Sequence, residues 1–242
     1  MYKSPTFTFV ASILRAADAL EFDQFRAFAI SYLQKMWTAN LSDLSHTLDN
    51  AADAVLLARR CNVNGMLKRA LYELLISEGF KQSEADRIDP GVEDGENKSV
   101  LSTSDFSLLV HAREQLTTFW MQKAIPPPQP TICKSLRNSS AYRTCAVTRH
   151  RTHELYKELV HDSKTFERYR FDPIWGLEIL RSAPWIEGEV WPSTQPREGL
   201  LLPTTEIGYL CSACAQVWRA IWRAEKIKLW HDIGTWLGNG NK

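Results

Sequence analysis

Residues 51–80, AADAVLLARRCNVNGMLKRALYELLISEGF, contain two apolar stripes of helical spacing separated by a short polar turn. The stripes consist of Ala51, Ala54, Val55, Ala58 and Cys61, and of Met66, Leu67, Ala70, Leu71, Leu74 and Leu75. Asn62, Asn64 and Gly65 between them are typical of a helix end followed by a turn. Because neither helix can bury its stripe alone, we predict a helical hairpin against which further helices pack.

The residues before this hairpin also have helical periodicity. Residues 8–20 predict one helix, with Ile13, Leu14, Ala17 and Leu20 on one side. A second helix is expected to begin at Asp23, whose carboxylate could cap it. Its predicted buried face consists of Phe25, Phe28, Ala29, Tyr32, Leu33 and Met36.

Downstream of the hairpin the composition changes twice. Residues 81–99 are polar and contain Pro90, Gly91 and Gly95, which favours a solvent-exposed loop over an acidic docking segment. A long helix is then expected, capped by Ser102 or Ser104 and ended by the three prolines at 126–128. We place the boundary between two domains at this proline run.

The region 131–242 is rich in tryptophan and predicts a second helical module. Helices are expected at 139–161 and from Asp172-Pro173, and an irregular Pro- and Gly-containing segment at 184–208. A final helix starts near Cys211. Its stripe of Trp218, Trp222, Leu229 and Trp236 is expected to face inward, against the two preceding helices.

Cys211 and Cys214 form the sharpest local motif in the chain. Two thiolates three residues apart at a helix start could bind one Zn²⁺, with Cys133 and Cys145, or a histidine such as His150 or His153, completing the site. The spacing of twelve residues between Cys133 and Cys145 is wider than that of a standard zinc knuckle. Packing of buried free cysteines is the more common alternative, and a redox CxxC would need a strand-to-helix context that is not seen.

Overall composition excludes several protein classes. The chain has 242 residues, of which 44% are hydrophobic and 24% charged, with a formal net charge of +1. This near-neutral charge gives no global reason to expect nucleic acid as a partner. No apolar run approaches the roughly 20 residues of a membrane span, and the N-terminal residues make a poor signal peptide. We therefore expect an intracellular protein, cytoplasmic or nuclear, without a membrane partner.

Catalytic motifs are not evident in the sequence. His150 and His153, followed by Glu154, do not have the spacing of a metalloprotease helix. There is no Gly-rich phosphate loop, no GxSxG and no HExxH. The sequence therefore predicts no enzymatic activity and no catalytic residues.

Six segments carry a family resemblance. Three lie in the first half: ASILRAADALEFDQFRAFAISYL, DAVLLARRCNVNGMLKRALYELLISEGF and DFSLLVHAREQLTTFWMQKAIPPP. Three follow later: FDPIWGLEIL, CSACAQVWRAIW and EKIKLWHDIGTWLG. The first set resembles the helical region that follows the BTB/POZ fold in fungal BTB domain-containing proteins, and the second set is similar to the C-terminal part of the same proteins. The BTB core itself would precede Met1 and is not in this sequence.

The resemblance implies a role in protein–protein interaction. Proteins of that family commonly dimerise and act as adaptors for cullin-type ubiquitin ligases or in transcriptional regulation. The family offers no catalytic residues. Without the BTB core, dimerisation and ligase docking through that core are not implied for this chain.

These observations together predict an all-α protein with two parts. The first is a BACK-like helical bundle at 8–125 with a mobile loop at 81–99, and the second is a Trp- and Cys-containing helical module at 131–242. The expected function is a non-enzymatic adaptor or scaffold with protein partners, among them a second copy of the chain. The alternative is a regulatory protein that is stabilised by zinc at Cys133, Cys145, Cys211 and Cys214 and contacts nucleic acid.

Overall fold

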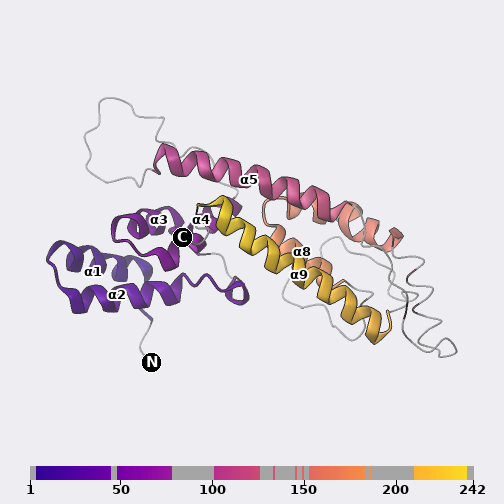
Figure 1. Cartoon of the computed structure of the whole chain (residues 1–242), viewed down its shortest axis with the longest axis horizontal. Helices are drawn as coiled ribbons and strands as arrows, with labels where there is room; N and C mark the ends of the chain where they lie inside the picture. Colours follow the sequence, from indigo (N-terminus) through magenta and orange to yellow (C-terminus); the bar gives the residue numbers. More distant parts are fainter. Residues whose placement is uncertain are drawn as a thin grey trace. The chain divides into compact units, whose positions relative to one another are not determined.

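The structure is a computed structural model that describes residues 4–44, 48–77, 101–125, 133, 145, 149, 153–183, 186 and 210–238. All regular secondary structure in these ranges is helical, and they contain no strand (Figure 1). The predicted all-α class is therefore confirmed. The predicted loop at 81–99, the proline run and the segment 187–208 lie outside the described residues.

The chain divides into two compact units. Unit 1 consists of Met1–Arg113 together with His231–Lys242, and unit 2 consists of Glu114–Trp230. The domain boundary predicted at the proline run falls on residues that the structure does not describe, and it stays a prediction. In the part of the chain that is described, no helix is long and apolar enough to cross a membrane.

Unit 1 begins with two helical hairpins that are consecutive in the sequence. The helices are α1 (Phe7–Ala19), α2 (Asp23–Met36), α3 (Ala51–Arg60) and α4 (Asn64–Ile76), with a short 3-10 turn, η1 (Leu41–Asp43), between the pairs. α1 lies beside α2, and α3 packs on α4 (Figure 1). The helices predicted from apolar periodicity are thus confirmed.

The α3–α4 hairpin buries its predicted stripes with two exceptions. Ala51 and Leu74 are only partly buried, whereas Leu71 and Leu75 are 1% and 0% exposed. Asn62 in the connection has a left-handed backbone conformation, with φ of 55°. Asparagine tolerates this conformation better than most residues, which explains its place in the turn.

α2 differs from the prediction in its cap and in its buried face. Phe22 occupies the N-cap position without a side-chain cap, and Asp23 lies in the first turn, where its charge favours the helix dipole. Ala29 and Leu33 are buried, but Phe25 and Phe28 are 61% and 56% exposed. The helix carries two apolar edges, and only the edge with Ala29 and Leu33 packs into the core.

A buried ion pair fixes the segment between the two hairpins. Arg69 and Glu73, one turn apart on α4, approach to 2.5 Å, and their side chains are 2% and 4% exposed. The Leu48 backbone N–H donates to the Glu73 carboxylate at 3.3 Å, and the Arg69 guanidinium donates to the Asp43 carbonyl at 3.4 Å. The pair therefore ties the residues around η1 to α4.

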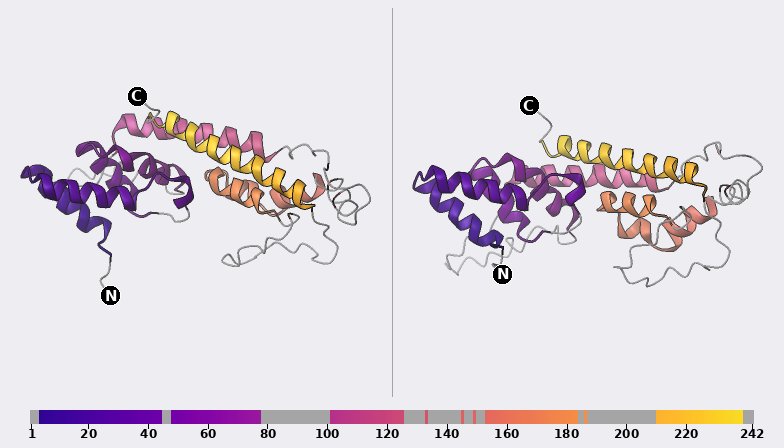
Figure 2. Two further views of the ribbon diagram at one scale, coloured as in Figure 1. Left: turned by 60° about the horizontal axis from the view of Figure 1, so that its bottom comes forward. Right: turned by 90° about the horizontal axis from the view of Figure 1, so that it is seen from below.

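Two long helices contribute residues to both units: α5 (Thr103–Ala124) and α9 (Ser212–Trp236). The Ser102 hydroxyl accepts a hydrogen bond from the Asp105 backbone N–H at 3.0 Å, so Ser102 is the cap of α5. Within unit 2, α9 runs alongside α5 (Figure 2), and Lys123 donates to Glu225 at 2.7 Å.

Shorter helices complete unit 2. Residues 153–157 are helical and continue into η3 (Glu158–Asp162), a π-helical turn, followed by α7 (Thr165–Arg168) and α8 (Pro173–Arg181). The Asp172 carboxylate caps α8 by accepting from the Trp175 N–H at 3.2 Å, and Pro173 stands in the first turn, as the sequence predicted.

The core of unit 2 is aromatic. Trp218 and Trp222 are 6% and 3% exposed, and both rings contact Tyr156, with centroid separations of 6.3 and 6.4 Å. The Trp218 indole N–H donates to the Leu180 carbonyl at 2.7 Å, and that of Trp120 to the Phe166 carbonyl at 2.8 Å. The predicted inward stripe is confirmed for Trp218, Trp222 and Leu229, while Trp236 is partly exposed.

Candidate metal centre

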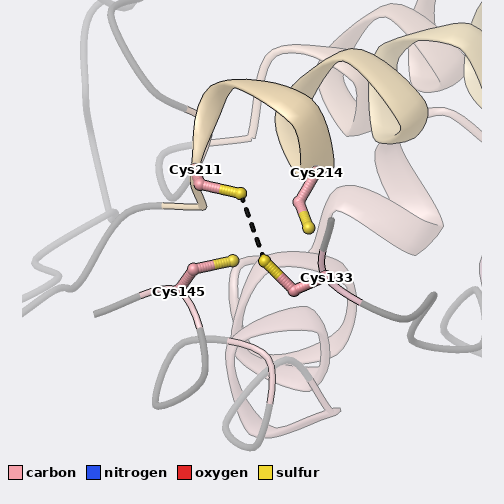
Figure 3. A group of neighbouring side chains, drawn as sticks. All are labelled: Cys133, Cys145, Cys211 and Cys214. Carbon is pink, nitrogen blue, oxygen red and sulfur yellow. Dashed lines mark hydrogen bonds between the residues drawn. The ribbon is translucent and has the colours of Figure 1, made fainter. Parts of the chain in front are cut away.

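Four cysteines from distant parts of unit 2 meet at the start of α9. Cys211 directly precedes the helix and Cys214 is its third residue, while Cys133 and Cys145 come from before the 153–162 helix. Figure 3 shows the four side chains directed toward one point between them. The sequence proposed these four residues as candidate ligands, and the structure brings all of them together.

The sulfur positions fit a single small ion. All four Sγ atoms lie within 4.8 Å of one another, and those of Cys133 and Cys211 are 3.5 Å apart. Tetrahedral zinc with bonds of about 2.3 Å holds its ligand sulfurs roughly 3.8 Å apart. A disulfide needs about 2.05 Å, and all five cysteines of the chain are free thiols.

The cluster is shielded from solvent. Cys145 is fully buried, and the most exposed of the four, Cys133, is 8% exposed. Burial is the main cause that raises the pKa of Cys145 and of Cys214, and hydrogen bonds with the neighbouring thiols also raise that of Cys214. Without a cation the thiols of Cys145 and Cys214 therefore keep their protons. A divalent ion would replace those protons, because thiolate rather than thiol is the metal ligand.

The start of α9 supplies favourable electrostatics for thiolates. The Cys211 carbonyl accepts the first helical hydrogen bond, from the Ala215 N–H at 2.9 Å, so Cys211 stands at the N-cap. The free N–H groups of a first helical turn give this end a partial positive charge. Cys211 and Cys214 both lie within it.

The histidines considered as substitute ligands do not take part in this cluster. His153 is exposed, and His150 lies outside the described residues. Among the residues that the structure describes, the four cysteines are the one group of three or more His, Cys, Asp or Glu side chains arranged to hold a metal ion. Cys61, the fifth cysteine, is buried at the end of α3 in unit 1.

Comparison of the chain with protein-family models, with curated proteins and with solved structures gives no match. The resemblance to BTB domain-containing proteins therefore stays a prediction. The candidate site is assigned from its geometry.

Proposed function

We propose that this protein is a non-enzymatic interaction adaptor or scaffold, related to BTB domain-containing proteins, whose unit 2 is held together by one structural zinc ion. The ligands would be Cys133, Cys145, Cys211 and Cys214. The observation that carries the zinc proposal is the convergence of four buried sulfurs within 4.8 Å. The adaptor role rests on the family resemblance and on the all-α architecture.

Zinc suits this donor set better than other common ions. Thiolates are soft ligands, whereas Mg²⁺ and Ca²⁺ prefer oxygen. Catalytic zinc sites keep one coordination position open for water or substrate, but four cysteines close the tetrahedron. The site is therefore assigned a structural and not a catalytic role.

Such an ion would stabilise unit 2 by joining remote residues. Cys133 and Cys211 are 78 residues apart in the sequence. The conformational entropy lost on closing a chain segment grows with its length. The free energy of metal binding would offset this loss for the long segment between Cys133 and Cys211. The ion would hold the residues around Cys133 and Cys145 against the first turn of α9.

The nucleic-acid alternative finds less support in the same helix. Stacking on bases requires exposed aromatic rings, whereas Trp218, Trp222 and Trp230 are all less than 9% exposed. Arg223 and Lys228 are exposed on α9, but solvated charges on a helix face are common. We therefore favour a protein partner.

Metal analysis of the purified full-length chain tests the zinc proposal. We expect one zinc per chain, and a cobalt-substituted protein with the absorption of tetrahedral thiolate coordination. Cys145→Ser and Cys214→Ser should lower the zinc content and affinity. Cys61→Ser is the matched control, because Cys61 is equally buried but outside the cluster, and it should keep full occupancy.

Two outcomes contradict the zinc proposal. One is a folded, reduced chain that binds no zinc when the ion is supplied. The other is loss of zinc in Cys61→Ser to the same degree as in Cys214→Ser.

The adaptor role has a separate test in cells. A specific protein partner, identified by proximity labelling of the tagged chain, should form a saturable complex with it when both are purified. Finding that no labelled protein binds the purified chain would contradict the adaptor role and leave the metal site unaffected.

A further inference from the structure

An exposed aromatic stripe runs along α2. It consists of Phe22 at the N-cap, Phe25, Phe28 and the partly buried Tyr32, spaced three to four residues apart, and we call it the phenylalanine face. The three phenylalanines are 54%, 61% and 56% exposed. The rings of Phe22 and Phe25 are 6.3 Å apart, as are those of Phe28 and Tyr32. The face therefore extends over about 15 Å of helix.

This face is large for a solvent-facing helix. A phenylalanine presents about 150–250 Å² when fully exposed. Three rings that are each more than half exposed, with Leu20 at 61% beside them in the sequence, give on the order of 400 Å² of apolar surface. Patches of about this size on a monomer often mark an interaction site.

We propose that the phenylalanine face binds the same face of a second copy of this chain, with the two α2 helices antiparallel. The charges at the two ends of the phenylalanine face support a second copy of the chain as its binding partner. Glu21 precedes the helix and Lys35 lies in its last turn, and each is seven residues from Phe28. A two-fold axis near Phe28 therefore places Lys35 beside Glu21 of the partner subunit.

The two charges are free to make this contact. Neither Glu21 nor Lys35 forms an ion pair within the described part of unit 1. A closed symmetric dimer uses one patch on both copies, so the patch must complement itself. An apolar centre with an acidic end and a basic end does this only when the helices are antiparallel, which also aligns their dipoles favourably.

The apolar area buried between the two copies determines the affinity that we expect for the dimer. Two copies of the face bury roughly 800 Å² of apolar surface, and flanking polar atoms raise the total toward the about 1,000 Å² of a weak specific interface. We expect a dissociation constant on the order of micromolar. All of these residues belong to unit 1, so the proposal is independent of the cysteine cluster.

Sedimentation of the full-length chain over a concentration series tests this proposal. The wild-type chain should pass from monomer to dimer. Phe28→Asp should raise the dissociation constant at least about tenfold, with unchanged circular dichroism because the side chain is exposed. Ile227→Asp is the matched control: Ile227 is an exposed apolar residue of α9, 54% exposed, and its substitution should leave the dimer intact.

A charge exchange tests the antiparallel arrangement. Lys35→Glu should weaken the dimer, because two acidic groups then meet at each end. Adding Glu21→Lys in the same chain should restore it. A wild-type chain that stays monomeric at all concentrations would overturn the proposal, and so would a Phe28→Asp variant that dimerises like the wild type. Failure of the double charge variant to recover dimerisation would overturn the antiparallel pairing.

Discussion

The two units of this protein are stabilised by different kinds of contact. In unit 1, helices that follow one another in the sequence pair as hairpins, and aliphatic side chains such as Val55, Leu71 and Leu75 fill the core. In unit 2, aromatic rings and four cysteines come together from distant segments, as Cys133 and Cys211 do across 78 residues. Short connections cost little entropy on closure, whereas long ones cost more. The aromatic core and the cysteine cluster of unit 2 therefore depend on long-range contacts, whereas the two hairpins of unit 1 form between neighbouring helices.

The largest expected effect comes from removing metal. A strong chelator under reducing conditions should raise amide hydrogen exchange at the start of α9 at least about a hundredfold, because bound ligand contributes stability in proportion to its affinity. Exchange in α3 and α4 should not change. Hydrogen exchange with mass spectrometry measures both regions in one sample. Equal loss of protection in α3–α4 would contradict a stabilising effect of the metal that is confined to unit 2.

The buried ion pair of unit 1 should be the most sensitive point of its hairpins. Glu73→Ala leaves the Arg69 guanidinium without its carboxylate partner at a site that is 2% exposed, so we expect a loss of about 3–5 kcal/mol in the free energy of unfolding. Urea unfolding measures this change. The double variant Arg69→Met, Glu73→Leu should recover most of the loss, because it removes both charges.

A more exposed ion pair is the control for this comparison. Arg59 is 47% exposed and pairs with Asp105 at 2.7 Å. Its partner Asp105 is only 8% exposed, but that carboxylate also accepts a hydrogen bond from the Ser102 hydroxyl at 2.9 Å and lies in the first turn of α5. Arg59→Ala should therefore cost about 1 kcal/mol, less than Glu73→Ala, because solvent screens the guanidinium and the carboxylate keeps favourable neighbours. If Glu73→Ala costs no more than Arg59→Ala, the pair on α4 is not the buried link described above.

Alanine substitutions at two helical glycines allow a comparison of side-chain packing in the two units. A Cβ at Gly176 would lie 2.5 Å from the Trp120 ring, whereas at Gly65 it would meet the movable amide end of Gln34, at 2.9 Å. Gly176→Ala should therefore destabilise by about 1–3 kcal/mol, through displacement of a buried indole. Gly65→Ala should change stability little, or raise it by up to about 1 kcal/mol through helix propensity. Thermal unfolding of both variants would show the difference, and equal values would contradict the tight packing of Trp120.

The smallest expected effect is a pH dependence in unit 2. Burial opposes ionisation of Glu178, but hydrogen bonds and charges from Arg181 and Lys226 outweigh it and lower the pKa of that carboxyl group. Because the pKa is lower in the folded state, Glu178 contributes stability above its unfolded pKa. That contribution is lost as the pH falls through the folded value.

Glu178→Gln provides the measurement. The stability difference between wild type and this variant should be full above about pH 5 and shrink on acidification below the ordinary glutamate pKa of about 4.3. Denaturant unfolding at several pH values measures it. A difference that grows toward low pH would have the wrong sign for this ion pair.

Apolar periodicity in the sequence was enough to predict the described helices of unit 1 and the inward stripe of α9. The sequence also offered Ser102 as one of two candidate caps, placed a helix start at Asp172-Pro173 and identified Asn62 as a turn residue, because helix ends are governed by local hydrogen bonding and backbone conformation. These features depend on residues within a few positions of one another. The local amino-acid pattern is therefore enough to determine them.

Only the tertiary structure decided which of several equivalent apolar edges is buried and which cysteines meet. The predicted buried faces included both Phe25 and Ala29 of α2 and both Leu74 and Leu75 of α4, but only Ala29 and Leu75 are buried, because a helix is covered only where its neighbours pack. The spacing of twelve residues between Cys133 and Cys145 is not that of a standard zinc motif, so the sequence could only propose them as ligands of Cys211 and Cys214. Their convergence depends on the way in which the long connecting segments fold back. Local periodicity carries no information about that path.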